Sequence, residues 1–445
     1  MHQHCRRGKM IALAMLLVCA DATLADDGPG HWMTGDWNGA RTRLVDAGID
    51  LQVSYNSQLA GNLQGGFNDD RTVRYVDQWA FRADLDFEKL FDWPAADARI
   101  TISKRNGHDL SIDRLADPRA PLLSSSVQSS YGYGDVWRLS HLWYRQRFDE
   151  GRVEIKLGRL PMGDDLGTAG CDFQNLAFCG ALPAHGTGIW INYPVSQWGI
   201  QGKWQFTPVL NVQIGAFEYN PSLTGPNEGF TLDTEGRVGS MYIVEFGWTP
   251  RLGARGLAGN YRVGTYFNST DADDLLMDVE GNQQPLTGLP FKRHSHRRGA
   301  GLIIRQQLAQ PDPGQPLRGP EIFFHYTRND RNTARVDEQW QAALLYQGLF
   351  NARPDDRAGI GLSNVHGNRR VVLLRSLENA LNGIDPDDPA YQLLPRTEVA
   401  AELFYQWQLR PWLSLRPNLQ YIGNPGGVAS IDDAWVIGLT VNADL

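Results

Sequence analysis

Much of the chain alternates between apolar and polar residues with a period of two. The segment WAFRADLDF (residues 79–87) places its aromatic and aliphatic side chains on one side and an arginine and two aspartates on the other. The same arrangement recurs in RVEIKLG (152–158), WGIQGKWQF (198–206), LSLRPNLQY (413–421) and the last residues of the chain (435–445). A period of two predicts β-strands. Each predicted strand therefore has one apolar face and one face of charges and amides.

Soluble β-sandwiches also contain strands with one polar face, so alternation alone does not identify a membrane barrel. Three further features favour one. The mean hydropathy is low, and the sequence contains no apolar helical span. A closed barrel is the other structure that can satisfy its backbone hydrogen-bonding groups within lipid. Aromatic residues stand near the predicted strand ends, as in interfacial girdles, and long connections alternate with short ones.

The lengths of the connections predict the number of strands. If the first strand, near residues 49–57, runs outward, the loop after it extends to residue 78 and the next turn is compact. The segments 188–194 and 370–376 look like strands, but we assign both to long loops, because counting 188–194 would invert the polarity of everything after it. The prediction is an all-β fold, a transmembrane antiparallel barrel of about 16 strands with both termini on the short-turn side and a water-filled interior. The other long connections are expected near 107–135, 160–197, 218–239, 268–297, 329–336, 364–396 and 423–433, and short turns at 149–151, 207–208 and 410–411.

The N-terminus has the three parts of a secretory signal peptide. Basic residues precede an apolar run of about ten residues and a small-residue cleavage site at Ala25. We therefore expect residues 1–25 to be a signal peptide, 26–48 a periplasmic segment with a short helix, and 49–445 the outer-membrane barrel. Asp36 is placed to cap the start of that helix.

Charge and motifs exclude several function classes. The net charge is −8 and becomes −10 without residues 1–25, which contain three basic residues and one acidic residue. No basic cluster predicts a nucleic-acid partner, and neither a nucleotide-binding glycine motif nor a GxSxG turn is present. The HSHRR segment (294–298) lacks further ligands at usable spacing, and the acidic stretches 271–274 and 385–389 lack the ligand ladder of a calcium loop. We expect no cofactor and no metal.

Four segments resemble the recurring segments of the OprB-type carbohydrate-selective porins of Gram-negative outer membranes. They are TGDWNGARTRLVDAGIDL (34–51), CDFQNLAFCG (171–180), SQWGIQGKWQFTPVLNVQIGAFEYNPS (196–222) and PWLSLRPNLQYIGNPGG (411–427). The resemblance extends from about Trp32 to Leu445. It implies a barrel in the outer membrane that admits monosaccharides, glucose above all, by passive diffusion through an eyelet rich in arginine. The expected partners are small-molecule sugars and outer-membrane lipid with lipopolysaccharide, while monomer and homotrimer both stay open.

The polar faces of the early strands supply candidates for this eyelet. A sugar presents hydroxyl groups and flat C–H faces, so its selective passage needs planar donors, acceptors and an aromatic platform. Arginine is a rigid fork of donors, carboxylates accept hydroxyl protons and orient the guanidinium groups, and binding has to stay weak enough for release. The alternative for each residue is an ordinary lumen charge, or a packing role for the tryptophan. The candidates are Arg82, Asp84, Arg99, Arg105, Glu154 and Lys156, with Trp190 as the stacking platform.

Two cysteines, Cys171 and Cys179, lie within the expected long loop 160–197. Two thiols alone make a poor zinc site, their spacing is not CxxC, and an exported chain meets an oxidising compartment. We therefore expect a disulfide that fixes the shape of a constriction loop. Phe173, Asn175 and Phe178 are expected to pack this loop against the inner wall.

Two other functions compete with sugar diffusion. A less selective porin for organic acids or other small polar solutes would use the same scaffold, and the sequence does not separate the two because selectivity depends on ångström-scale geometry. An outer-membrane enzyme would need a serine and a histidine facing outward near the external girdle. Neither His141 nor His325 has an evident serine partner, so we expect the protein not to be an enzyme.

Overall fold

The computed structural model describes residues 31–120, 126–168 and 170–445. The predicted signal peptide, residues 1–25, lies outside the described residues. None of the helices in the described part of the chain is long and apolar enough to cross a membrane.

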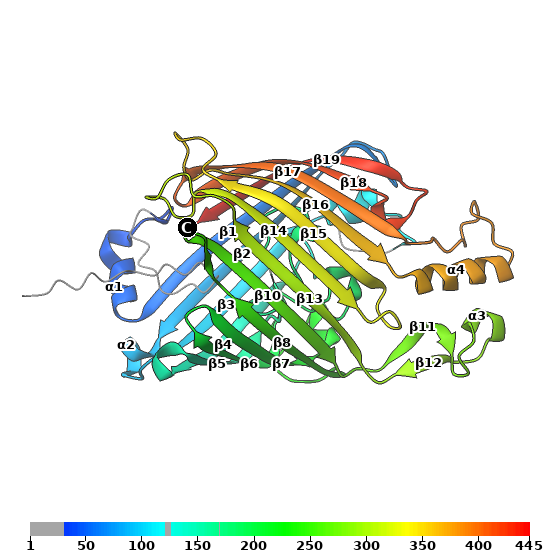
Figure 1. Cartoon of the computed structure of the whole chain (residues 1–445), viewed down its shortest axis with the longest axis horizontal. Helices are drawn as coiled ribbons and strands as arrows, with labels where there is room; N and C mark the ends of the chain where they lie inside the picture. Colours follow the sequence, from blue (N-terminus) through cyan, green and yellow to red (C-terminus); the bar gives the residue numbers. More distant parts are fainter. Residues whose placement is uncertain (1–30, 121–125, 169) are drawn as a thin grey trace, which may run out of the picture.

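The chain forms a closed antiparallel barrel (Figure 1). Each barrel strand pairs with the next one along the chain, and β19 pairs back with β1 through residues such as Ser57 and Val441. The predicted barrel of about 16 strands is confirmed. Its strands are β1 (Ile49–Gly66), β2 (Val73–Asp86), β3 (Ala96–Gly107), β4 (Trp137–Phe148), β5 (Val153–Leu160), β6 (Gln197–Thr207), β7 (Leu210–Tyr219), β8 (Gly239–Trp248), β10 (Leu257–Asn268), β13 (Arg297–Gln307), β14 (Gly319–Asn329), β15 (Val336–Gln347), β16 (Arg357–Gly367), β17 (Thr397–Arg410), β18 (Leu413–Gly423) and β19 (Asp432–Asp444). A short strand, β9 (Arg251–Leu252), pairs with the start of β10.

The two faces of each strand have the polarity that the alternation predicts. On β19, Ile437 points outward and is 53% exposed, whereas Thr440 points inward and is fully buried. On β18, the inward positions include Arg416 and Gln420, both buried. An apolar face that is exposed and a polar face that is buried are the reverse of a soluble protein, and they fit a barrel whose outer surface meets lipid.

The longest connections lie at the predicted long-loop end, but the alternation in length is not strict. The β14–β15 connection (330–335), predicted to be long, is shorter than the β13–β14 and β15–β16 connections (308–318 and 348–356) at the opposite end. The loop expected from residue 57 to 78 is much shorter, because β1 continues to Gly66 and β2 already begins at Val73. The glycines, asparagines and aspartates of this region predicted a loop. The backbone of residues 58–66 is nevertheless paired with β2 and β19, and this pairing does not depend on side-chain type.

The two strand-like segments assigned to loops form no strands. Residues 188–194 lie in the β5–β6 connection, and residues 370–376 belong to α4 (Arg369–Leu381). The helix α4 lies beside a β-hairpin and a short helix that project beyond the barrel end (Figure 1). These elements are β11 (Ala272–Asp278), α3 (Gln284–Thr287) and β12 (Phe291–His294).

Two further helices lie at the opposite, short-turn end of the barrel (Figure 1). The helix α1 (Ala40–Asp46) is the one predicted before the first strand, and α2 (Phe87–Phe91) lies between β2 and β3. The N-cap position of α1 is Gly39 and not Asp36 as predicted. Asp36 nevertheless binds the first turn of the helix, because its Oδ1 atom accepts a hydrogen bond of 2.8 Å from the backbone amide of Thr42.

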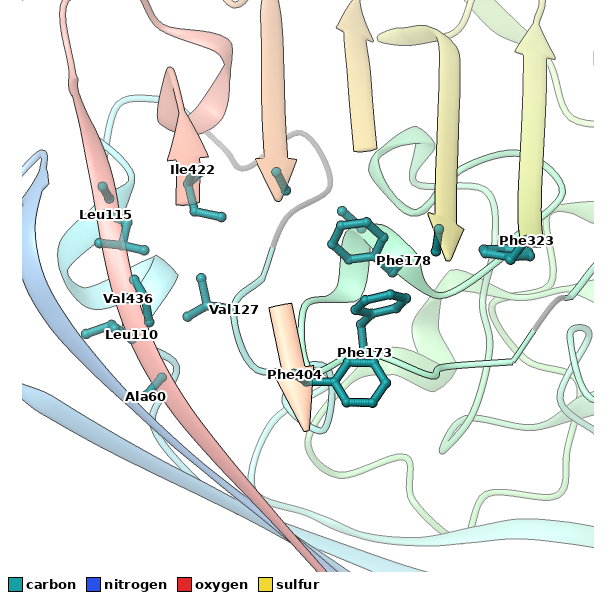
Figure 2. Close-up of a cluster of buried hydrophobic side chains, with 14 of the residues drawn as sticks. Ala60, Leu110, Leu115, Val127, Phe173, Phe178, Phe323, Phe404, Ile422 and Val436 are labelled. Carbon is teal, nitrogen blue, oxygen red and sulfur yellow. The ribbon is translucent and has the colours of Figure 1, made fainter. Parts of the chain in front are cut away.

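The barrel encloses apolar packing as well as polar side chains. The β3–β4 and β5–β6 connections contribute Leu110, Val127, Phe173 and Phe178 to one buried cluster with residues of the wall. Figure 2 shows the rings of Phe173 and Phe178 together, with Phe404 of β17 beside Phe173. This cluster holds both connections inside the barrel.

Candidate pore constriction

The predicted disulfide between Cys171 and Cys179 is present. Within the ring that it closes, Phe173 and Phe178 have ring centroids 4.5 Å apart, and Phe173 meets Phe404 edge-on at 5.1 Å. Both phenylalanines are about 1% exposed. The disulfide ring, defined as residues 171–179, is therefore packed against the wall of the barrel.

Backbone hydrogen bonds attach the disulfide ring to β17. The carboxylate of Glu402 accepts the amides of Gln174 and Asn175, one on each oxygen, at 2.8 Å. The side chain of Asn175 also donates to Gln420 on β18 at 3.1 Å. Glu402 therefore fastens two adjacent backbone amides of the ring to the wall.

Gln174 is a fully buried junction between two loops and the wall. Its Nε2 atom donates to the carbonyl oxygens of Leu59 and Val127 at 3.0 and 3.1 Å. Its Oε1 atom accepts from Asn418 at 2.8 Å and from Thr440 at 2.9 Å. Sequence reasoning missed this residue, because nothing local distinguishes it from an exposed loop glutamine.

Asp172, at the start of the ring, lies among inward-facing arginines. Its carboxylate binds Arg305 of β13 and Arg357 of β16, and its carbonyl oxygen accepts from Arg416 of β18. Burial alone would raise the pKa of Asp172, but the Arg357 and Arg305 guanidinium groups outweigh it and hold that pKa below its usual value. The ring thus brings a permanent negative charge to a basic part of the wall.

A cavity of ≈ 250 Å³ lies between the disulfide ring and the wall. Arg105 enters it from β3, where it donates to Gln78 at 2.8 Å and to the carbonyl of Tyr131 at 3.0 Å. Arg416 lines the same cavity from β18, so two guanidinium groups from separate parts of the wall meet there. The remaining lining residues are Asn56, Gln58, Gln78, Ser129, Ser130, Cys171, Tyr193 and Asn442.

The other predicted charges lie side by side along the inner wall of β2 to β5. Asp84 pairs with both Arg82 and Arg99, the latter at 2.6 Å. Glu154 lies 3.5 Å from Arg145 and from Arg147. Neighbouring strands thus pair their charges within the wall. We call Arg82, Asp84, Asp97, Arg99, Arg145, Arg147, Glu154 and Lys156 the charge ladder.

Trp143 of β4 is the aromatic partner of this ladder, and sequence reasoning did not single it out. The cationic groups of Lys156, Arg145 and Arg99 lie 4.8, 5.5 and 5.1 Å from the centre of its ring. Cations at these distances are attracted by the ring's negative face. The pairing Arg99↔Trp143 in the β3–β4 register is what brings these residues together.

Trp190 lies in the β5–β6 connection, as expected, but its ring is 4% exposed. It belongs to a buried cluster with Met162, Ile189 and Ile191. The structure therefore places Arg105 in the cavity, places Arg82, Asp84, Arg99, Glu154 and Lys156 in the charge ladder, and places Trp190 in loop packing.

Comparison with known proteins gives consistent matches over the whole barrel. A model of the OprB family of carbohydrate-selective porins matches residues 70–445. Porin B of Pseudomonas aeruginosa is 43% identical over 412 residues, which cover 92% of this chain and 90% of that protein. The putative porin QuiX of Acinetobacter baylyi is 36% identical over 444 residues, covering 97% of this chain and 98% of that protein. The high pH structure of Pseudomonas putida OprB superimposes with a TM-score of 0.91 at 44% identity, covering 95% of this chain and 100% of that chain.

Proposed function

Because the chain belongs to the OprB family of carbohydrate-selective porins, we propose that it admits monosaccharides such as glucose to the periplasm by passive, substrate-selective diffusion. The family is one of channels of the Gram-negative outer membrane. In this proposal, residues 1–25 direct export, residues 26–48 remain in the periplasm, and residues 49–445 form the channel.

The cavity beside the disulfide ring is the observation that carries the proposal. Its lining combines guanidinium groups of Arg105 and Arg416 with neutral amides and hydroxyls. Such groups match the hydroxyls of a neutral sugar, since planar donors and amide oxygens pair with them without requiring a charge on the solute. The ring of Tyr193 is also part of the lining and offers an aromatic surface for the C–H face of a sugar.

The charge ladder has a different place in the proposal. Its three carboxylates already pair with its arginines, so a neutral solute meets a wall of paired charges there. We propose that Arg82, Asp84, Arg99, Glu154 and Lys156 conduct the solute along the wall, and that Arg105 belongs to the selective constriction. The disulfide ring keeps this constriction in shape.

Liposome swelling with a panel of sugars and organic acids tests this assignment. Reconstituted wild type is compared with Arg105→Ala and Arg82→Ala, and with Arg293→Ala, which alters an exposed arginine on the external hairpin, as the matched control. We expect Arg105→Ala to change the order of permeation among the sugars and the control to leave it unchanged.

Several outcomes would contradict the proposal. If the protein forms no channels in planar bilayers, or if sugars do not alter its conductance, sugar diffusion is wrong. Unchanged permeation in both Arg105→Ala and Arg82→Ala would remove the eyelet assignment. If organic acids permeate and glucose neither binds nor competes, the protein is instead a porin for small polar anions, for which the two guanidinium groups in the cavity would be the binding groups.

A further inference from the structure

A second cavity, of ≈ 330 Å³, lies at the long-loop end of strands β14 to β16. We call it the rim cavity. It is separate from the constriction and shares no lining residue with it. Its lining consists of Arg328, Arg331, Asp337, Glu338, His366 and Arg369.

Strand register shows that the rim cavity is on the outer surface of the barrel. Arg328 pairs with Glu338, and Glu338 pairs with His366, so the three form one row across β14, β15 and β16. On β14, the alternate residues His325 and Thr327 are fully buried and belong to the lumen face. Because side chains alternate along a strand, the row that contains Arg328 points away from the lumen.

The rows beneath this one are those of a membrane-facing surface. The next row toward the barrel centre pairs Tyr326 with Trp340, the residue types that mark membrane interfaces. Two rows further on, Ile322, Leu344 and Ile360 are aligned and are 39%, 46% and 55% exposed. The rim cavity thus lies where the apolar band of the barrel ends and lipid headgroups begin.

The cavity contains more cations than anions. Asp337 accepts from the Nδ1 atom of His366 at 2.6 Å and lies 3.7 Å from Arg331. Within the described part of the chain, Arg328 and Arg369 form no ion pair. Both are exposed. The second carboxylate of the lining, Glu338, lies opposite Arg328 in the strand register and accepts a hydrogen bond of 3.1 Å from Tyr326. The cavity therefore contains three guanidinium groups against two carboxylates.

Arg369 is also the first residue of α4, whose N-cap Asn368 binds the amide of Arg370. The N-terminal end of a helix carries a partial positive charge, which adds to the positive potential of Arg328 and Arg369 in the cavity. Arginine forks bind phosphate with paired, charge-assisted hydrogen bonds. A phosphate monoester held at the level of Tyr326 and Trp340 would therefore satisfy both arginines.

We propose that the rim cavity binds a phosphate group on the headgroup of an outer-leaflet lipid, such as lipopolysaccharide. Arg328 and Arg369 hold the phosphate, and Asp337 orients Arg331 and His366 beside it. The acyl chains of the lipid then lie along the apolar rows of β14, β15 and β16. This site rests on the placement of the barrel in the outer membrane and not on the sugar selectivity proposed above.

Lipid binding to the full-length protein in detergent tests the proposal. The three probes are diphosphorylated lipid A, the same lipid without its phosphates, and inorganic phosphate. We compare wild type with the double variant R328Q/R369Q. The matched control is R251Q/R255Q, which removes two exposed arginines at the short-turn end of the barrel. We expect R328Q/R369Q to bind diphosphorylated lipid A at least about tenfold more weakly and the control to bind it as wild type does.

Single-channel conductance equal to that of wild type shows that the double variant is folded, because neither arginine lines the lumen. Equal binding of the phosphorylated lipid by wild type and R328Q/R369Q would overturn the proposal, as would equal binding of the dephosphorylated lipid by wild type. If inorganic phosphate competes fully at low concentration, the cavity is a site for free anions and the lipid assignment is wrong. These results do not depend on which solutes permeate, so sugar selectivity is tested separately.

Discussion

The Oε1 atom of Glu402 accepts the backbone amide of Gln174 at 2.8 Å. Glu402 is on β17, and Gln174 is in the middle of the disulfide ring. This hydrogen bond and its neighbour to the amide of Asn175 join a loop to a wall strand more than two hundred residues away in the chain. The two hydrogen bonds fix the middle of the disulfide ring to the wall of the barrel.

Replacing Glu402 with Gln should loosen the disulfide ring. A glutamine keeps one carbonyl oxygen, so one of the two amides loses its acceptor, and a buried unsatisfied group costs about 1–3 kcal/mol. We expect faster hydrogen exchange at the amides of Gln174 and Asn175 and noisier single-channel current. Glu280→Gln, an exposed carboxylate on the external hairpin, is the control. Unchanged exchange in E402Q would show that the apolar cluster holds the ring by itself.

Reducing the bond between Cys171 and Cys179 should broaden the distribution of channel conductance or weaken solute selectivity. A disulfide that closes about nine residues stabilises by roughly 2–3 kcal/mol in the chain-entropy model, and Cys171 lines the cavity. The measurement is planar-bilayer conductance before and after reduction, repeated with the double Cys→Ser variant. If the reduced channel behaves like the oxidised one, the disulfide stabilises the loop but does not determine conductance or selectivity.

Asp172→Asn should make the channel more selective for anions, since Arg305 and Arg357 lose a counter-charge. The effect appears as a shift in reversal potential under a salt gradient. Because the pKa of Asp172 is lowered, its carboxylate should stay charged in wild type well below pH 7. Its contribution to loop stability is present above the unfolded pKa of about 3.9 and is lost as pH falls through the lowered folded pKa. The difference in selectivity between wild type and D172N should therefore stay constant from pH 7 to about pH 4, and the loss of that difference near pH 6 would contradict this prediction.

Gly438→Ala should displace Gln174. A Cβ atom at this position would lie 2.3 Å from Asn418 Oδ1 and 2.7 Å from Gln174 Nε2, so the buried hydrogen-bond junction has to shift. Overpacking of this kind typically costs about 1–3 kcal/mol. We expect a lower unfolding midpoint and altered conductance. Gly61→Ala is the control, because its Cβ would meet the nearest atom at 3.4 Å, and equal effects of the two changes would contradict the explanation.

Arg41→Ala should weaken the closure of the barrel. Arg41 donates to the carbonyl of Leu445 at 2.9 Å, and its guanidinium carbon lies 4.4 Å from the ring centres of Trp32 and Trp37. This contact attaches the N-terminal segment to the end of the closing strand β19. Losing it should lower stability by about 1–3 kcal/mol, measured as unfolding in urea after folding into micelles. Arg43→Ala, an exposed arginine on the same helix, should have little effect.

The alternation of residues predicted the strand faces correctly because successive side chains point alternately to lipid, which favours apolar groups, and to the lumen, which favours polar groups. The strand faces and the inward direction of Arg82, Asp84 and Arg105 follow from that period, and the barrel of about 16 strands follows from the period together with the lengths of the connections. The disulfide also followed from sequence, since two nearby cysteines in an exported loop have few other uses. The first loop was misjudged because strand pairing can continue through glycine and amide residues.

The contacts of the constriction could not be predicted from any such local pattern in the sequence. Asp172 meets Arg357 at a separation of 185 residues, and Gln174 meets Thr440 at 266. Each pairing depends on which inward-facing side chain a loop reaches once the barrel has closed. The period of two determines which face of the sheet a side chain occupies. It does not determine which loop residue contacts that side chain inside the barrel. The order of successive residues thus determines the fold and the polarity of the strand faces. The constriction, in contrast, forms only when the loops pack against the closed wall of the barrel.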